Sequence, residues 1–161
     1  MCAMPQIGCA KCSNCRAGRP HRCDKALNRA TPGNPGAYSE FVRIGAQETF
    51  RLPDSVTFQE GALVEPLAVG LHAVKRAKIT AGDNVLIVGG GPVGLSVAVW
   101  CKFFGARHII VSDLIADRAE KAGDFGTTGF VDASVSYMPE TYEKIVGLPP
   151  SIIFDAVGVA G

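Results

Sequence analysis

The feature that most constrains this chain is a glycine-rich turn between two apolar runs. Residues 85–88 form an unbroken, mostly β-branched apolar run, which is typical of a strand buried on both faces. The run ends at a G-x-G-x-x-G sequence, residues 89–94, and apolar residues then recur at helical spacing. A second apolar run, residues 108–111, ends at Ser112-Asp113. This order of strand, glycine turn, helix, strand and acidic residue predicts an α/β fold with a doubly wound parallel sheet.

Each part of this pattern suits a dinucleotide cofactor. Gly89 allows a tight turn, Gly91 leaves room for a pyrophosphate to approach the backbone, and Gly94 allows the helix to pack closely on the strand. The helix N-terminus offers unpaired N–H groups and a positive dipole end to the phosphates. Asp113 can accept hydrogen bonds from the adenosine ribose hydroxyls and would repel a 2′-phosphate, so the pattern favours NAD over NADP.

Composition narrows the range of partners. The chain has 161 residues, of which 47% are hydrophobic and 19% charged, and its net charge is +1. No basic field indicates binding to nucleic acid or to an anionic membrane. The apolar run at the glycine turn is shorter than the roughly 18 residues that a membrane span needs. The N-terminus has no basic region followed by an apolar core, so we expect a cytoplasmic chain with a small-molecule partner.

Four of the six cysteines are closely spaced in a C-x2-C-x2-C-x7-C pattern; they are Cys9, Cys12, Cys15 and Cys23. Four thiolates at such spacing can converge on one tetrahedral ion and leave no open position, so the pattern predicts a structural zinc site. Free or disulfide-bonded thiols are a less favoured alternative in a chain without a secretion signal. An iron–sulfur cluster is another, although the spacing differs from that of bacterial ferredoxins.

The stretch between the cysteines and the middle of the chain is predicted to be β-rich. Residues 36–44 alternate roughly between apolar and polar side chains, as in a half-exposed strand. A second short segment, residues 49–52, ends at Pro53. Both segments suit an antiparallel sheet.

A break between two helices is predicted further on. Thr57 and Glu60 have the spacing of a capping box that opens a helix. Proline is well placed to start a helix, so Pro66 predicts a break at Glu65 and a second helix over residues 66–77. On the residues alone, Glu65 is most simply a solvated carboxylate stabilised by a helix N-terminus.

In combination, these motifs resemble the zinc-containing medium-chain alcohol dehydrogenases, and most of all their sorbitol, butanediol and threonine dehydrogenase branch. The resemblance rests on the four cysteines, on G-A-Y-S-E-F at residues 36–41, on G-A-L-V-E-P-L-A-V-G at residues 61–70 and on the glycine turn. It covers almost the whole chain. It implies part of a GroES-like, β-rich catalytic domain with a structural zinc lobe over residues 1–65, and a partial NAD-binding Rossmann domain over residues 66–161.

The resemblance also implies roles for single residues. Glu65 matches the glutamate of the E-P-L motif, which lies at the catalytic zinc and contacts the substrate, the metal or its bound water. Val93 matches a residue that touches the cofactor, and Pro92 is assigned to the same site. Asp113 and Arg118 match the pair that holds the adenosine ribose. The implied activity is hydride transfer from a polyol or secondary alcohol to NAD, by a homo-oligomer (a dimer or tetramer) in the intact enzyme.

The chain also departs from the family pattern. Family members carry an N-terminal zinc-binding cysteine and a Gly-His-Glu motif, whereas the histidines here are His21, His72 and His108, and none precedes a glutamate. Only one strand of the second Rossmann half, residues 151–155, is present. It should lie beside residues 85–88 as an apolar edge. We therefore expect an internal fragment of a dehydrogenase that is inactive by itself.

Two other functions fit less well. A zinc-independent quinone or enoyl reductase of the same fold typically lacks the cysteine lobe and prefers NADPH, which argues against it. A non-catalytic module that binds zinc and NAD agrees with the missing catalytic ligands, whereas Glu65 favours a catalytic protein. A complete enzyme should bind two zinc ions, and this sequence has a full ligand set for one.

Overall fold

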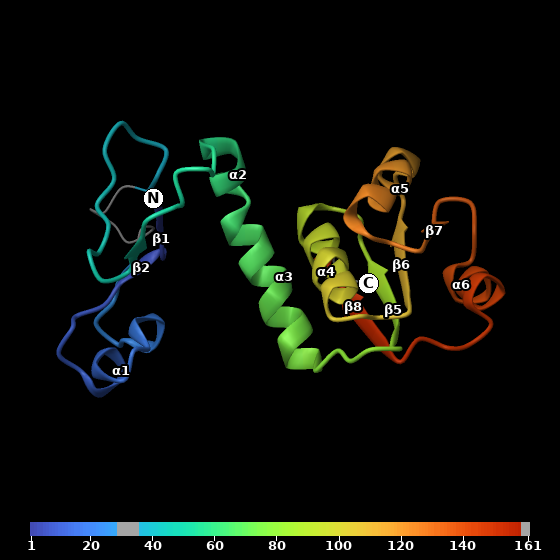
Figure 1. Ribbon diagram of the computed structural model, residues 1–161, viewed down its shortest axis with the longest axis horizontal. Coiled ribbons are helices and arrows are strands. Elements are labelled where there is room, and N and C mark those ends of the chain that lie inside the picture. Colours follow the sequence, from blue (N-terminus) through green and yellow to red (C-terminus); the bar gives the residue numbers. More distant parts are fainter. Residues whose placement is uncertain (29–35, 159–161) are drawn as a thin grey trace. The chain divides into compact units, whose positions relative to one another are not determined.

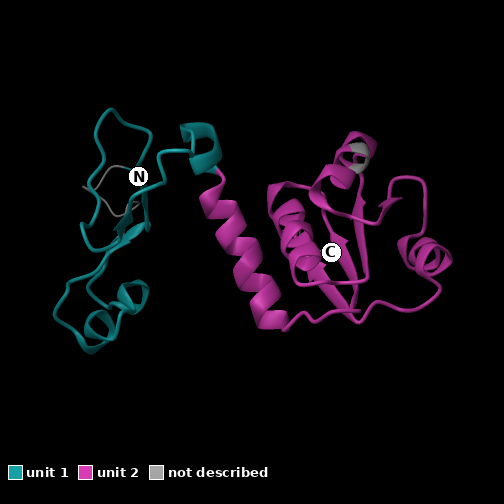
Figure 2. Cartoon of the chain, viewed as in Figure 1, with its two compact units in different colours: residues 1–62 teal, residues 63–161 magenta. Residues whose placement is uncertain are grey.

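The computed structural model describes residues 1–28 and 36–158. The chain forms two compact units, which are residues 1–62 (unit 1) and residues 63–161 (unit 2) (Figure 2). The predicted boundary between residues 65 and 66 lies slightly later in the chain. The assignment of these units to a catalytic and a cofactor-binding domain stays a prediction.

Unit 1 is built from very short elements. Two antiparallel strand pairs frame it: β1 (Cys2–Ala3) with β4 (Thr49–Phe50), and β2 (Gln6–Ile7) with β3 (Leu27–Asn28). Between β2 and β3 lie a four-residue helix, α1 (Ser13–Arg16), and a 3₁₀ turn, η1 (Pro20–Arg22). The cysteine motif occupies this loop. The sequence predicts a short strand segment over residues 49–52. Because β4 covers residues 49 and 50, the first half of this prediction is confirmed.

The strand predicted over residues 36–44 is wrong. These residues form bends and irregular chain without strand pairing, and Tyr38 and Phe41 are exposed. An alternating segment becomes a strand only where a neighbouring strand supplies hydrogen bonds and an apolar face to pack on. Within the described residues no strand pairs with this segment.

The capping box is confirmed, but the helix break lies earlier than predicted. Thr57 Oγ1 accepts a hydrogen bond from Glu60 N (3.2 Å), and Glu60 Oε2 accepts one from Thr57 N (2.8 Å), at the start of α2 (Phe58–Ala62). The second helix, α3 (Val64–Ala77), begins two residues before Pro66. The N–H groups of a first helical turn have no partner within the helix, so proline is accommodated inside that turn as well as at its start.

Unit 2 contains a four-stranded parallel sheet in the order β7-β6-β5-β8 (Figure 1). Its strands are β5 (Asn84–Val88), β6 (His108–Asp113), β7 (Gly129–Asp132) and β8 (Ile152–Asp155). They are connected by the helices α4 (Pro92–Phe103), α5 (Ala116–Ala122) with its 3₁₀ extension η2 (Gly123–Phe125), and α6 (Met138–Val146). Both strands around the glycine turn and the position of β8 beside β5 are confirmed.

The two faces of the sheet have separate cores. Val85, Ile87 and Ile109 point to one face, where they pack with residues of α3, α4 and α5. Leu86 and Ile110 point to the other face, where Tyr142 of α6 packs on them. Because the connections run in one direction from β5 to β7 and then return to β8, the strand order reverses between β5 and β8. Ligands of such sheets bind at the carboxyl ends of the strands at this reversal.

Helix α3 packs closely on α4. A side chain at Gly70 would collide with Ser96, and the indole Nε1 of Trp100 donates a hydrogen bond to the carbonyl oxygen of Leu67 (2.7 Å). These contacts hold the first turns of α3, where Glu65 lies, on the helix that follows the glycine turn.

The outer edge of β8 carries exposed apolar surface, as predicted. Ile153 is 60% exposed, and within the described residues no strand pairs with β8 on this side. In the same described part of the chain, none of the helices has the length and apolarity to cross a membrane.

Hydrogen bonds of Asp83, the residue before β5, connect the start of β5 to the start of β8. Its Oδ2 accepts hydrogen bonds from Thr80 N (2.7 Å) and Thr80 Oγ1 (3.0 Å), and its Oδ1 accepts one from Ser151 Oγ (3.0 Å). Ser151 Oγ in turn accepts a hydrogen bond from Asn84 N (3.1 Å). The hydrogen bond from the Thr80 amide is the main cause that lowers the pKa of Asp83 below its ordinary value.

We predict that Asp83→Asn lowers the free energy of unfolding by about 1 kcal/mol at pH 7, since charge-assisted hydrogen bonds are lost. Because the folded-state pKa of Asp83 is lowered, its contribution is complete above the unfolded pKa near 4 and is lost as the pH falls through the folded value. Urea unfolding from pH 7 to pH 3 measures this difference between wild type and variant. A substitution at exposed Asp124, Asp124→Asn, is the control, and a pH-independent difference would contradict the prediction.

Candidate cofactor and metal sites

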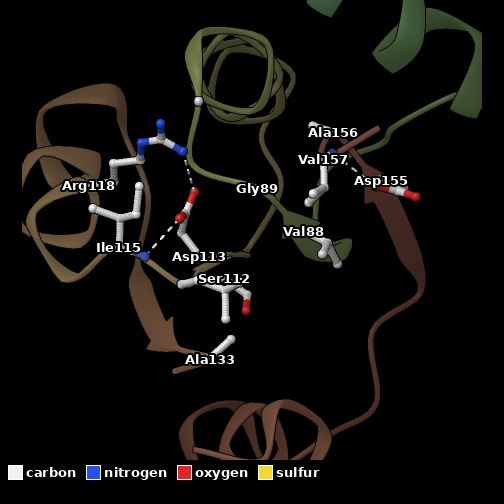
Figure 3. A pocket seen from close by; sticks show the side chains of 12 residues that line it. Val88, Gly89, Ser112, Asp113, Ile115, Arg118, Ala133, Asp155, Ala156 and Val157 are labelled. Carbon is white, nitrogen blue, oxygen red and sulfur yellow. Dashed lines mark hydrogen bonds and ion pairs between the residues drawn. The ribbon is translucent and has the colours of Figure 1, made fainter. Parts of the chain in front are cut away.

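A pocket of about 700 Å³ opens at the carboxyl ends of β5, β6 and β8 (Figure 3). Gly89 and Gly91 of the turn line it. The other elements contribute Asp113 at the end of β6, Arg118 in α5, Asp155 at the end of β8 and Val157 just after it. It therefore lies where the strand order reverses, which is the place expected for a ligand of such a sheet.

Two positions of the glycine-rich turn, Gly89 and Gly94, do not tolerate a side chain. Gly89 has φ +104°, a backbone conformation that side chains disfavour, and its N–H donates to the carbonyl oxygen of Ser112 (2.7 Å). A Cβ at Gly94 would collide with the carbonyl oxygen of Gly89. The predicted close packing at Gly94 is thus confirmed: α4 contacts the turn directly before it.

Gly91 differs from the other two glycines because the space beside it is open. It is the N-cap of α4, and no atom lies within 4 Å of the position that a Cβ would take. Pro92 is the first residue of α4, where the lack of an N–H costs nothing, and Val93 follows with 40% exposure. The open space therefore faces a helix N-terminus that can hold an anion.

Asp113 is held in place by three hydrogen bonds. Its Oδ2 accepts from Gly90 N (2.7 Å) and from Arg118 Nη1 (3.2 Å), and its Oδ1 accepts from Ile115 N (2.9 Å). The Asp113 side chain is 7% exposed, whereas that of Arg118 is 48% exposed. Burial is the largest single influence and raises the pKa of Asp113, but the hydrogen bonds and the Arg118 charge together outweigh it and lower the pKa. Asp113 is therefore an ionised acceptor at neutral pH.

The acceptor capacity of Asp113 is only partly used by the protein. A carboxylate has about four acceptor positions, and three are occupied here, one of them by the solvent-exposed Arg118. A diol such as the ribose of a nucleotide can use the fourth position and can replace Arg118 at the third.

Several residues that line the pocket were not predicted from the sequence. Leu114 and Ile115 line it directly after Asp113, and Ala133 lines it beyond β7. Asp155 and Val157 come from the end of β8 (Figure 3). Their presence follows from the parallel order of the strands, since the carboxyl ends of neighbouring strands share one edge.

The four cysteines of the motif converge in the lobe of unit 1. The sulfur atoms of Cys9, Cys12, Cys15 and Cys23 all lie within 4.8 Å of one another. Zinc–sulfur bonds of about 2.3 Å in a tetrahedron place sulfurs about 3.8 Å apart, so the four thiols fit a zinc ion. The loop also has the form of a metal knuckle, because Cys12 N points at Cys9 Sγ and Cys15 N points at Cys12 Sγ (both 3.4 Å).

The thiols differ in how readily they lose a proton. Hydrogen bonds from the backbone N–H groups of Lys11 and Cys12 lower the pKa of Cys9 to about 6, whereas burial raises the pKa of Cys15 to about 12. A thiolate at Cys9 is thus available near neutral pH, and a metal ion would have to displace the proton of Cys15.

Cys101 lies outside this group. It is fully buried in the core of unit 2, and burial, followed by the charge of Asp83, raises its pKa to about 12. Cys101 is thus a small packing residue of the apolar core.

Glu65 lies in the first turn of α3, and it is exposed. It does not line the pocket at the strand ends. Its assignment to a catalytic metal stays a prediction that depends on the resemblance to the family.

Comparison with known proteins gives a consistent picture, although no protein-family model matches the chain. Sorbitol dehydrogenase from Ovis aries is 38% identical over 148 residues, which are 90% of this chain and 42% of the sheep enzyme. A zinc-binding dehydrogenase from Sinorhizobium meliloti bound to NADP has 32% identity and a TM-score of 0.83, over 98% of this chain and 47% of that one.

The chain belongs to the zinc-containing medium-chain alcohol dehydrogenase family. An alcohol dehydrogenase from Escherichia coli in complex with NADH is also similar, with 27% identity and a TM-score of 0.82, over 96% of this chain and 46% of that one. The chain thus spans less than half the length of these dehydrogenases. The agreement supports the predicted fold class, a partial Rossmann sheet preceded by part of a GroES-like domain.

Two glycines of the turn should respond differently to alanine. Gly94→Ala is predicted to lower the free energy of unfolding by about 2 kcal/mol, because its Cβ overlaps the carbonyl oxygen of Gly89 and α4 must move away. Gly91→Ala, with open space at its Cβ, should change stability by less than about 1 kcal/mol. Thermal unfolding followed by circular dichroism compares the two, and equal losses would contradict the packing described for α4.

Proposed function

We propose that this chain is the zinc- and NAD-binding part of a dehydrogenase that oxidises a polyol or a secondary alcohol. The observation that carries the proposal is Asp113, an oriented and ionised carboxylate that shares one pocket with the open space at Gly91. Family membership and the sorbitol dehydrogenase of Ovis aries support the class of substrate.

Different residues of the pocket are proposed to bind different parts of the cofactor. Gly89, Gly91 and Gly94 shape the turn so that the first turn of α4, with Pro92 and Val93, faces a pyrophosphate. Asp113 accepts hydrogen bonds from the hydroxyls of the adenosine ribose, and Arg118 closes the same end of the pocket. When bound, NAD supplies the hydride acceptor, and these residues orient it.

The charge at the ribose end favours NAD. Similar structures contain NADH in one case and NADP in another, so family membership alone does not select the cofactor. An ionised Asp113 repels a 2′-phosphate, and the Arg118 guanidinium that could attract one is already paired with Asp113 (3.2 Å).

The zinc site of unit 1 is proposed to be structural. Four cysteine ligands fill the coordination shell and leave no position for a substrate. The ion would contribute folding free energy to a loop that has few buried apolar residues of its own.

Glu65 is proposed to act at a second, catalytic zinc, where it would hold the bound water or a substrate hydroxyl. Within the described residues the four cysteines are the one group of side chains placed to bind a metal ion. We therefore propose that these 161 residues bind zinc and NAD without turning over alcohol. A module that only binds zinc and NAD is the second candidate, favoured by the same observation.

Metal and cofactor stoichiometry tests the proposal. The purified chain should contain one zinc ion, measured by mass spectrometry under native conditions, and should bind one NAD more tightly than NADP, measured by calorimetry. Asp113→Ala should weaken NAD binding by at least about tenfold, because two hydrogen bonds to a charged acceptor are lost. Glu140→Ala, a change in the first turn of α6, is the control.

A preference for NADP, or wild-type affinity for NAD in Asp113→Ala, would contradict the cofactor assignment. Reduction of NAD by the chain with sorbitol or 2,3-butanediol would contradict the absence of turnover, and it would also exclude the purely binding module.

A further inference from the structure

Glu48 is an unusual carboxylate because it is buried and lies outside the pocket at the strand ends. It is 5% exposed, which is the smallest exposed fraction of any acidic residue in the described part of the chain. An ionised carboxylate loses several kcal/mol of hydration when it is buried, so it persists only where hydrogen bonds replace the lost water. None of the roles proposed above uses Glu48.

The side chain of Glu48 reaches the start of the cysteine lobe. Its Oε1 accepts a hydrogen bond from the backbone N–H of Gly8 (3.0 Å), the residue directly before Cys9. Its main chain is also fixed, because Met4 N donates to the carbonyl oxygen of Glu48 (2.9 Å) and Glu48 N donates to the carbonyl oxygen of Gly45 (3.2 Å). A rigid backbone thus aims the carboxylate at a single amide of the lobe.

Two glycines make room for this contact. A Cβ at Gly8 would lie 2.9 Å from Cys15 Sγ, 2.9 Å from Pro20 Cβ and 3.2 Å from Glu48 Oε1. A Cβ at Gly45 would collide with Glu48 Oε2. Gly8 is therefore enclosed by the Cys15 sulfur, by Pro20 and by the Glu48 carboxylate, so the position of Gly8 relative to both Cys9 and Cys15 depends on Glu48.

We infer that Glu48 is a positioning residue for the cysteine metal site: it holds the Gly8 amide so that Cys9 and Cys15 keep the geometry that a tetrahedral ion requires. This inference rests on the proposed zinc site. Glu48 is not itself a ligand, since the group of converging side chains consists of the four cysteines. Groups that orient metal ligands typically change metal affinity by about 10–100-fold when they are removed.

The hydrogen bond, and not the charge, supplies this effect. A zinc ion with four thiolates carries a net negative charge, so the negative charge of Glu48 is repelled by the site and only its acceptor oxygen helps. Glutamine has nearly the same shape and keeps that acceptor. The two properties can therefore be separated by substitution.

The experiment titrates Co²⁺ into the apo chain and measures the thiolate-to-cobalt charge-transfer bands and the dissociation constant. Glu48→Ala is expected to weaken Co²⁺ binding by about 10–100-fold and to shift the bands. Glu48→Gln is expected to bind within about threefold of wild type. Glu60→Ala is the matched control, since Glu60 is also a carboxylate of unit 1 that accepts a backbone hydrogen bond (from Thr57 N, 2.8 Å), but at the start of α2; we expect it to bind like wild type.

If Glu48→Ala binds Co²⁺ with wild-type affinity and wild-type bands, the inference is overturned but the proposed zinc site is not. If the wild-type chain gives no four-thiolate cobalt spectrum, the proposed zinc site itself is overturned. Equal losses in Glu48→Ala and Glu48→Gln would also overturn the role of the hydrogen bond. If Glu48→Ala fails to fold, Glu48→Asp, which retracts the carboxylate by one methylene, replaces it. An affinity about tenfold weaker supports the inference, and wild-type affinity overturns it.

Discussion

The close approach of α4 to the turn before it is the constraint on which unit 2 depends. Gly94 lies against the carbonyl oxygen of Gly89, so that α4 starts directly above the end of β5. That position brings the open space at Gly91 to the carboxyl ends of the strands. From the same edge of the sheet, β6 contributes Asp113, and the hydrogen bond from Gly90 to Asp113 joins the turn to the carboxylate. One steric contact thus places Gly91 and Asp113, the proposed anion and ribose sites, in a single pocket.

Unit 1 is stabilised in a different way. Among residues 1–28 and 36–158, the buried apolar side chains belong to unit 2, with the exception of Cys23 in the cysteine lobe. Strands of two residues contribute few hydrogen bonds. In the proposed zinc site, a metal ion held by four thiolates would supply the cross-links that an apolar core otherwise provides. A carboxylate such as Glu48 would be costly in an apolar core, whereas here its Oε1 accepts a hydrogen bond from the Gly8 amide.

The sequence predicts those parts of the molecule whose pattern is local. The strands and the helix around the glycine turn follow from apolar periodicity and from glycines at fixed spacing, and the capping box follows from Thr57 and Glu60. The strand predicted for residues 36–44 failed because a strand needs a partner that a local pattern does not reveal. The break at Glu65 was misplaced because proline is tolerated throughout a first helical turn. Glu48 has no sequence signal at all, since its burial arises from a contact with a residue forty positions away.

The central claim is that NAD binds between the glycine turn and Asp113. The most direct measurement is an NMR titration of the ¹⁵N-labelled chain with NAD. The account predicts that the largest amide shift changes fall in residues 89–94 and 113–118, with the Gly90 amide among them because it donates to Asp113, the carboxylate proposed to bind the ribose. Shift changes confined to other parts of the chain, or none at millimolar NAD, would contradict it.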